Sequence, residues 1–156
     1  SVPISRLTMY AKDPESETVG IYLLTGDDLP GQAILTLSLD DAMYLADWLL
    51  EERPGTTSKL NPLACSALSE FGNQALSSFL NALAEFTATP LRLSPPAVMV
   101  DMLATVLETT VIPVAPMTDE LLIIETNFTN VESSLLTRFW VLPDPDALPT
   151  DRAKTK

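Results

Sequence analysis

The sequence predicts an α+β fold in which two antiparallel hairpin half-units form one sheet that packs against long helices. Two pairs of β-rich runs, one in each half of the chain, have the alternation and the turn residues of hairpins. Between them, residues 61–86 form one long helical pattern interrupted by a single glycine. The length of 156 residues is sufficient for one domain with one sizeable core.

The first hairpin is predicted from residues 19–24 and 32–37. The first of these runs is rich in β-branched and aromatic residues, and a polar segment at 25–31 with two glycines and one proline separates the two. A shorter strand is expected at residues 7–11. Residues 12–17 are polar and contain Pro14, and they are therefore expected to form a loop.

A first helix is predicted to begin after this hairpin. The segment Ser38-Leu39-Asp40-Asp41 matches a capping box, and residues 42–52 continue with helical spacing through Leu45 and Leu49. Residues 53–58, which contain Pro54 and Gly55, are expected to link this helix to the next one.

The long helix is predicted to begin at Asn61-Pro62, with asparagine as N-cap and proline at the first helical position. One face is expected to be buried, and it carries Ala64, Leu68, Phe71, Ala75, Phe79, Ala82 and Phe86. The opposite face carries a narrow polar stripe of Ser66, Glu70, Asn73, Ser77 and Asn81. A solvated helix face of this length usually carries Lys, Arg and several Glu, so small polar groups with one carboxylate favour a docking surface.

The second half of the chain is predicted to contain a short strand, a helix and a second hairpin. The short strand is at 91–93, and Pro96 is expected to end it and to direct a helix at 97–108. Residues 121–126 and 135–142 are the predicted hairpin strands. After Pro143 the composition changes to Pro, Asp, Thr and Lys, which predicts one domain at residues 1–145 and a flexible tail at 146–156.

A faint internal repeat relates residues 19–42 to residues 121–147. Both segments run strand, threonine, polar loop, strand and Asp-Ala. Each unit needs a long helix to cover its sheet, and only one long helix is predicted. The pattern therefore indicates two half-units with one helix missing or supplied by another subunit.

Composition and charge exclude several classes of function. The net charge is −12, from 21 acidic and 9 basic residues, and three of the bases lie in the last five residues; nucleic-acid binding is therefore not expected. No apolar run is long enough to span a bilayer and no signal-peptide pattern opens the chain, so membrane insertion is not expected. The first residue, Ser1, leads us to expect that an N-terminal piece was removed or left out.

The inventory of reactive side chains is narrow. A single cysteine, Cys65, excludes an internal disulfide and fits a reducing cytoplasm, where we expect the protein to reside. The absence of histidine removes the usual catalytic triads and the commonest general base at neutral pH. Asp40-Asp41 and Asp119-Glu120 are typical of caps or solvated ends, so no metal site is predicted. Carboxylate, amide and hydroxyl groups must therefore perform any chemistry.

Glu70 and Asn73 are the candidate reactive pair. At positions i and i+3 of a helix their side chains emerge about 60° apart. Together they present an acceptor-only carboxylate and a carboxamide that both donates and accepts. Hydrolysis of an acyl phosphate requires an ordered in-line water and neutralised charge, and a carboxamide can order water. For an arbitrary Glu and Asn at this spacing, the alternative is a solvated surface pair.

The spacing of Ser66, Glu70, Asn73 and Pro96 resembles the motif of the CheC/CheX/FliY chemotaxis phosphatases. That motif is Asp or Ser, three residues, Glu, two residues, Asn, then twenty-two residues and Pro, and every interval is met here. Further segments resemble the second half of a CheC protein in register, namely 11–15, 25–27, 78–86 and 100–102.

The resemblance implies a phosphatase that hydrolyses the aspartyl phosphate of a CheY-like response regulator. It implies that Asn73 orients the attacking water in the partner's site and that Glu70 pairs with the partner's active-site lysine. Ser66, Ser77 and Pro96 would contact the partner. Mg²⁺ is expected on the response regulator, and no cofactor is expected on this chain.

Two other functions remain open. The first is a non-catalytic adaptor that binds CheD, a flagellar-switch component or a receiver. The second is a purely structural subunit of a larger assembly. Taken residue by residue, Ser66 also fits a helix-surface hydroxyl, and Pro96 also fits a structural role.

Other positions have structural interpretations. Gly72 lowers helix stability relative to alanine by about 1 kcal/mol, so a packing reason is expected there. Cys65, Trp48 and Trp140 are expected in or near the core, and Glu85 is expected to be an exposed charge.

The sequence departs from the family pattern in three respects. Ser77 stands where the family tends to have glycine, and Gln74 replaces an apolar residue. The Glu/Asn helix of the first half of a full-length CheC protein is absent before Val2-Pro3. A truncated chain, a natural single-site protein or a homodimer whose subunits complete each other's sheets would each account for that absence.

Overall fold

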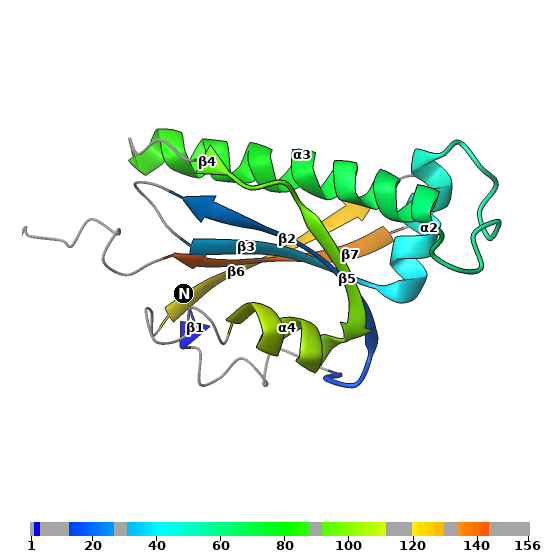
Figure 1. Ribbon diagram of the computed structural model, residues 1–156, viewed down its shortest axis with the longest axis horizontal. Helices are drawn as coiled ribbons and strands as arrows, with labels where there is room; N and C mark the ends of the chain where they lie inside the picture. The colour runs from blue at the N-terminus through cyan, green and yellow to red at the C-terminus, as the bar shows by residue number, and fades with distance from the viewer. Residues whose placement is uncertain are drawn as a thin grey trace, which may run out of the picture.

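The fold combines one antiparallel sheet with three helices in the part of the chain that can be described (Figure 1). The computed structural model describes the backbone of residues 2–3, 13–26, 31–87, 92–111, 120–129 and 134–143. The elements are β1 (Val2–Pro3), β2 (Glu17–Gly26), β3 (Gly31–Ser38), α2 (Leu39–Leu49), α3 (Pro62–Thr87), β4 (Arg92–Leu93), β5 (Ala97–Met102), α4 (Leu103–Val111), β6 (Glu120–Thr129) and β7 (Ser134–Pro143). This arrangement confirms the predicted α+β class. The strand expected at residues 7–11 and the tail expected at 146–156 lie outside the described residues.

The two predicted hairpins are present and share one sheet. Strand β2 pairs antiparallel with β3, from Thr18↔Ser38 to Thr25↔Gly31. Strand β6 pairs antiparallel with β7, and β7 also pairs with β3. The described strands therefore follow the order β1-β6-β7-β3-β2-β4, with β5 also paired to β2. The two hairpin half-units meet where β3 lies beside β7.

The predicted helix at residues 97–108 is wrong in its first half. Residues Ala97–Met102 form β5, which pairs antiparallel with β2 from Tyr22↔Ala97 to Glu17↔Met102, and α4 starts only at Leu103. The cause is tertiary: β2 offers backbone groups for pairing, and Val98 packs against the main core. Pro96 therefore leads into a strand and not into a helix.

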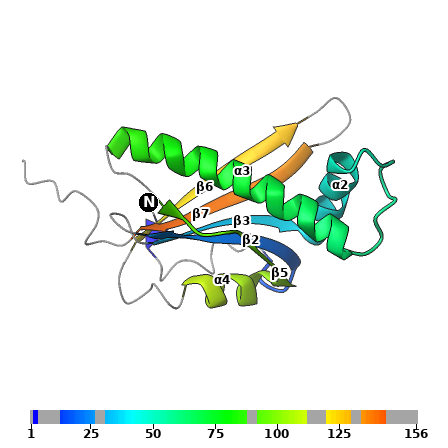
Figure 2. The same ribbon diagram turned by 45° about the horizontal axis from the view of Figure 1, so that its top comes forward.

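The two faces of the sheet are covered by different helices. Val19, Ile21 and Leu23 of β2 are fully buried in the core that contains residues of α2 and α3. Gly20 faces the other way, where a Cβ atom would lie 2.6 Å from Val106 of α4. Figures 1 and 2 show α3 over one face of the sheet and α4 beneath the other.

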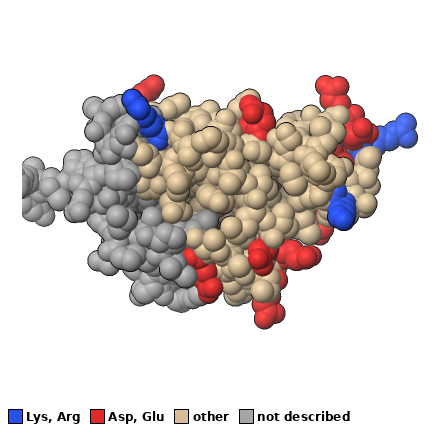
Figure 3. Space-filling view, viewed as in Figure 1, with Lys and Arg blue, Asp and Glu red and all other residues tan. Residues whose placement is uncertain are grey.

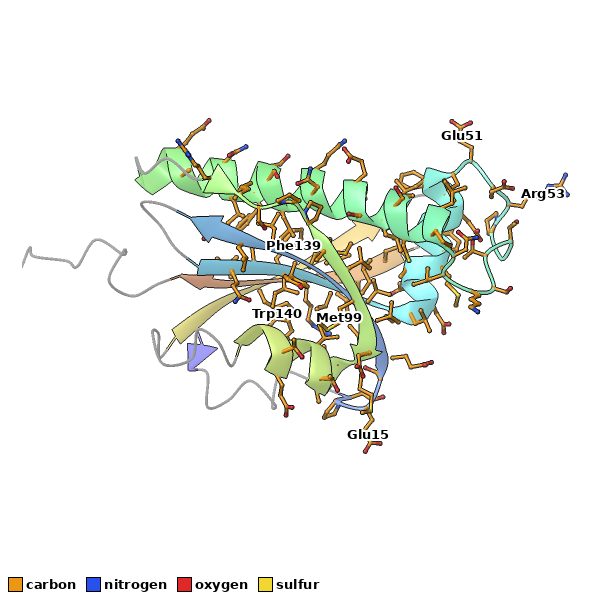
Figure 4. The ribbon with its side chains drawn as sticks, in the orientation of Figure 1. Glu15, Glu51, Arg53, Met99, Phe139 and Trp140 are labelled. Atoms are coloured by element: carbon orange, nitrogen blue, oxygen red, sulfur yellow. The ribbon has the colours of Figure 1, made fainter. Side chains whose placement is uncertain are left out.

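Strand β7 contributes one large aromatic side chain to each face. Phe139 packs against Phe79 of α3, with ring centroids 5.8 Å apart. Trp140 is fully buried, and its Nε1–H donates a 2.9 Å hydrogen bond to Thr36 Oγ1. Figure 4 shows the two aromatic side chains on opposite sides of the sheet. The expectation that Trp140 is a core residue is confirmed.

Helix α2 begins at its predicted cap. The Ser38 side chain accepts a hydrogen bond from the Asp41 backbone N–H at 3.1 Å. The buried side of the helix carries Ala42, Leu45, Ala46 and Asp47. Trp48, which was expected in or near the core, is instead 60% exposed, because at 100° per residue it points away from the face of Ala42, Leu45 and Ala46.

Helix α3 begins at Pro62, as its cap predicts. Asn61 Oδ1 accepts a 2.8 Å hydrogen bond from the Ala64 backbone N–H, so one of the free N–H groups of the first turn is satisfied. The helix then runs for 26 residues.

The side chains of α3 fall into four rows, each with a spacing of four residues. The buried row is Ala64, Leu68, Gly72, Leu76 and Leu80. The exposed row is Ser66, Glu70, Gln74, Ser78 and Ala82. Between them lie two half-buried rows, which we call the Asn73 flank (Cys65, Ser69, Asn73, Ser77) and the Phe79 flank (Ala67, Phe71, Ala75, Phe79).

These rows correct the buried face that the sequence predicted. Phe71, Ala75 and Phe79 are half-buried on a flank, and Ala82 is exposed; the Phe86 side chain lies outside the described residues. A row of i+4 steps drifts about 40° around the helix at each step. Because the buried row follows these steps, α3 meets the sheet along a slanting line. The predicted face, which was drawn parallel to the helix axis, therefore diverges from it.

Candidate functional site

Glu70 and Asn73 lie on adjacent rows of α3. Glu70 belongs to the exposed row, and Asn73 is half-buried on the Asn73 flank. Ser66 is exposed one turn before Glu70, and Ser77 is half-buried one turn after Asn73. The structure thus places four of the five predicted site residues on neighbouring rows of one helix.

The fifth residue, Pro96, comes from another part of the fold. It is half-buried in the segment between β4 and β5. The Phe79 flank of α3 faces β7, since Phe79 contacts Phe139. The Asn73 flank lies on the opposite side of the helix and so faces the edge of the sheet where β2 pairs with β5. Asn73 and Pro96 therefore lie toward the same side of α3.

Each member of the Glu70–Asn73 pair has a hydrogen-bond partner one helical turn further on. Gln74 Nε2–H donates to Glu70 Oε1 at 3.1 Å, and Ser77 Oγ–H donates to Asn73 Oδ1 at 3.4 Å. These two donors are the residues at which the sequence departs from the family pattern. The sequence showed that they are unusual but could not show which atoms they contact.

The surface around the pair is almost uncharged. Glu70 and Glu85 are the acidic residues of α3, and the helix contains no Lys or Arg. Glu85 is exposed, as expected. In Figure 3 the upper edge of the molecule, where α3 lies, is mostly free of charged side chains. Within α3 the carboxylate of Glu70 therefore has no basic neighbour.

Asp47 is a buried carboxylate that sequence reasoning missed. Its Oδ2 accepts from the backbone N–H groups of Gly55 at 2.8 Å and Thr56 at 3.0 Å, and its Oδ1 accepts from that of Thr57 at 2.8 Å. The Thr57 side-chain bond and these backbone bonds lower the pKa of Asp47, although burial opposes them. The carboxylate ties the α2–α3 connection to α2, so it supports the start of the helix that carries the site.

The structure gives no separate metal-binding cluster in its described part. There, no three His, Cys, Asp or Glu side chains come together in a way that could hold an ion. A cavity of about 320 Å³ lies at the α2–α3 connection and includes neither Glu70 nor Asn73; its lining is Leu50, Glu52, Thr56, Thr57, Ser58, Lys59, Asn61 and Leu63. Among the described helices, none is both long and apolar enough to cross a membrane.

Comparison of the sequence with protein families gives a match to the CheC-like family. The match covers residues 63–100. That segment contains Ser66, Glu70, Asn73, Ser77 and Pro96, and it spans most of α3 through the first part of β5.

Comparison with solved structures shows the same fold. FliY from Thermotoga maritima is 19% identical, with a TM-score of 0.68, 94% of this chain covered and 72% of the other. CheX from Vibrio vulnificus is 17% identical, with a TM-score of 0.55, 92% of this chain covered and 80% of the other. The CheX–CheY–BeF3–Mg²⁺ complex from Borrelia burgdorferi contains a chain that is 13% identical, with a TM-score of 0.54, 89% of this chain covered and 90% of the other.

Proposed function

Taking the chain as a member of the CheC/CheX/FliY family, as its family match and its fold support, we propose that it is a phosphatase for the aspartyl phosphate of a CheY-like response regulator. The observation that carries the proposal is the position of Glu70 and Asn73. They lie side by side on the outward part of α3, within the segment that matches the family.

Asn73 is proposed to orient the attacking water. Acyl-phosphate hydrolysis depends on placing a water in line with the leaving oxygen and on neutralising the phosphoryl charge. A carboxamide oxygen accepts a hydrogen bond from that water and so directs a water lone pair toward phosphorus. Asn73 is suited to this role because it is half-buried on a long helix, which restricts where its amide can reach.

Glu70 is proposed to anchor the helix to the partner's active-site lysine. Its exposed carboxylate stands without a neighbouring basic residue on α3. An exposed ion pair contributes only about 0.2–1 kcal/mol, so we expect Glu70 to set the register of docking more than the affinity. Ser66, Ser77 and Pro96 are proposed to complete the contact with the partner.

The metal is assigned to the partner in this proposal. When bound there, Mg²⁺ would neutralise charge on the phosphoryl oxygens, and this chain would contribute the amide and the carboxylate. One of the proteins that share the fold is a CheX in complex with CheY, BeF3 and Mg²⁺. That complex supports a CheY-like receiver as the partner to test first.

The decisive experiment measures loss of phosphate from a CheY-type receiver labelled with acetyl phosphate. The wild-type protein is expected to accelerate the loss. Asn73→Ala is expected to lower kcat by about 10²-fold, because the water is no longer placed. Glu70→Ala is expected to act mainly on KM. Glu85→Ala is the matched control, since Glu85 is the other exposed carboxylate of α3, and it should leave both constants unchanged.

A wild-type protein that leaves the rate of phosphate loss unchanged would contradict the phosphatase proposal. Binding to the receiver or to CheD without turnover would then support the non-catalytic adaptor. A homodimer is a separate proposal, tested by sedimentation of the free protein.

A further inference from the structure

We propose that Gln74 and Ser77 are positioning residues that act separately on the two members of the site. Gln74 holds the Glu70 carboxylate for docking, and Ser77 holds the Asn73 carboxamide for turnover. This inference rests on the proposed function and adds a division of labour to it. It is carried by the two hydrogen bonds that join each pair across one helical turn.

The Gln74–Glu70 bond restrains the carboxylate without using its charge. A carboxylate has about four acceptor positions, and the Gln74 amide takes one of them on Oε1. The remaining positions stay available to a lysine of the partner. Because glutamine is neutral, it orients Glu70 and leaves its full negative charge for the partner, which a lysine at the same position would not do.

The Ser77–Asn73 bond restrains the position of the amide on the helix surface. With Oδ1 accepting from Ser77 Oγ, the Nδ2 group must point to the other side of the carboxamide. The carbonyl oxygen keeps a second lone pair, which can accept from water. Because the hydroxyl can both donate and accept, Ser77 restrains where the Asn73 carboxamide lies but does not choose between its two flipped orientations. The orientation in the structure leaves a lone pair of Oδ1 for the water.

The two restraints differ in strength. The Gln74 distance of 3.1 Å lies within the usual range for an N–H donor, whereas 3.4 Å for Ser77 is longer than the roughly 3.0 Å limit usual for a hydroxyl donor. Side-chain pairs at i and i+4 shift populations on a helix by about 1.4- to 2.3-fold. We therefore expect single deletions of these bonds to change kinetic constants by about two-fold or less, with Ser77 giving the smaller effect.

A change of charge at residue 74 gives a stronger test. Gln74→Met retains length and helix propensity but removes the donor, and it should raise KM by about two-fold with kcat unchanged. Gln74→Lys pairs internally with Glu70 and places a positive charge against the partner's lysine. Like-charge contacts in an interface are strongly unfavourable, so KM should rise by about ten-fold or more.

Ser77 is tested through kcat. Ser77→Ala should lower kcat by up to about two-fold, and Ser77→Thr should restore kcat because it keeps the hydroxyl. Any accompanying change in KM would report the proposed contact of Ser77 with the partner. Ser78→Ala is the matched control, since Ser78 lies one turn beyond Gln74 on the exposed row and bonds neither Glu70 nor Asn73. Urea unfolding of every variant verifies that each is folded in the assay.

The outcomes separate this inference from the proposed function. Suppose that the wild-type protein hydrolyses the phosphorylated receiver. An unchanged KM for Gln74→Lys, or an unchanged kcat for Ser77→Ala, then refutes this inference and leaves the phosphatase proposal standing. If wild type binds a receiver loaded with BeF3 and Mg²⁺ but does not turn over, the phosphatase proposal and the role of Ser77 both fall. Weaker binding by Gln74→Lys would then still support the role of Gln74, and unchanged binding would refute it. Absence of both turnover and binding would refute everything proposed for this helix.

Discussion

At Gly72 the site helix comes close to the sheet, and Gly72→Ala is the perturbation that tests this packing. A Cβ atom at Gly72 would lie 2.5 Å from Ile21 Cγ2, 2.8 Å from its Cδ1 and 3.0 Å from its Cβ. Ordinary contact begins at 3.4 Å, so the nearest pair is about 0.9 Å too close. Ile21 is fully buried, and so are Leu68 and Leu76 on either side of Gly72. The helix or the strand must therefore move.

The expected cost follows from two opposing effects. Overpacking a filled core costs about 1–3 kcal/mol, whereas alanine favours a helix over glycine by about 1 kcal/mol. We expect a net loss of about 1–2 kcal/mol, because the closest atom, Ile21 Cγ2, is attached directly to Cβ and cannot swing away. For a chain of this length that loss lowers Tm by about 2–8 °C.

Urea unfolding monitored by the fluorescence of buried Trp140 measures the loss. Gly26→Ala is the matched control, since no atom lies within 4 Å of a Cβ at Gly26, and it should be neutral or slightly stabilising. A double-mutant cycle that combines Gly72→Ala with Ile21→Ala isolates the contact between residues 72 and 21. Ile21→Ala alone should cost about 2–5 kcal/mol, and adding Gly72→Ala to it should cost less than in wild type by at least about 1 kcal/mol.

A Gly72→Ala protein as stable as wild type, with no coupling to Ile21, would refute this account of the helix–sheet contact. The same variant carries information on function, because residue 72 lies between Glu70 and Asn73. A helix displaced by less than about 1 Å should lower kcat/KM of the proposed phosphatase, by up to about 10²-fold.

Three further changes test the supports of the site. Asn61→Ala should cost about 1 kcal/mol of unfolding free energy by removing the cap of α3, seen as a lower urea midpoint with an unchanged slope. Thr36→Val leaves the buried Trp140 Nε1–H without its acceptor and should cost about 1–3 kcal/mol in the same assay. The pKa of Asp47 is lowered below its ordinary 3.8, so its contribution to stability is present above pH 3.8 and is lost as the pH falls through the lower folded value. Asp47→Asn should therefore be less stable at neutral pH and lose this part of the acid sensitivity, as measured by urea unfolding across acid pH; equal acid sensitivity in both proteins would contradict the assignment.

Local signals predicted the elements that depend on local chemistry. We could predict the caps at Ser38 and Asn61 and both hairpins, because capping and turn residues determine the structure of residues only a few positions away in the sequence. Ser66, Glu70 and Asn73 could be placed on one helix for the same reason. The resemblance of the spacing of Ser66, Glu70, Asn73 and Pro96 to the family motif identified Glu70 and Asn73 as candidates, and their roles remain predictions.

Features that depend on distant neighbours were not predictable in this way. Residues 97–102 have no local feature that excludes a helix, and they form a strand because β2 lies beside them. Ala82 was assigned to the buried face because a helical wheel cannot show the angle at which α3 crosses a sheet. Trp48 was expected in or near the core, but it lies on the outward side of α2. The roles of Gln74 and Ser77 as hydrogen-bond donors likewise required coordinates.

The row arrangement of α3 has a consequence for how proteins of this type diversify. The side chains of the buried row are limited in size by the space between α3 and the sheet. Gly72 admits no side chain there, and its neighbours fill the remaining space. The exposed row is free of that limit, so substitutions there can change the outward surface of α3 while the fold persists. A lineage could thus change the surface that α3 presents by mutating one line of residues on a single helix. Solved chains that share only 13–19% of their residues with this one retain its fold.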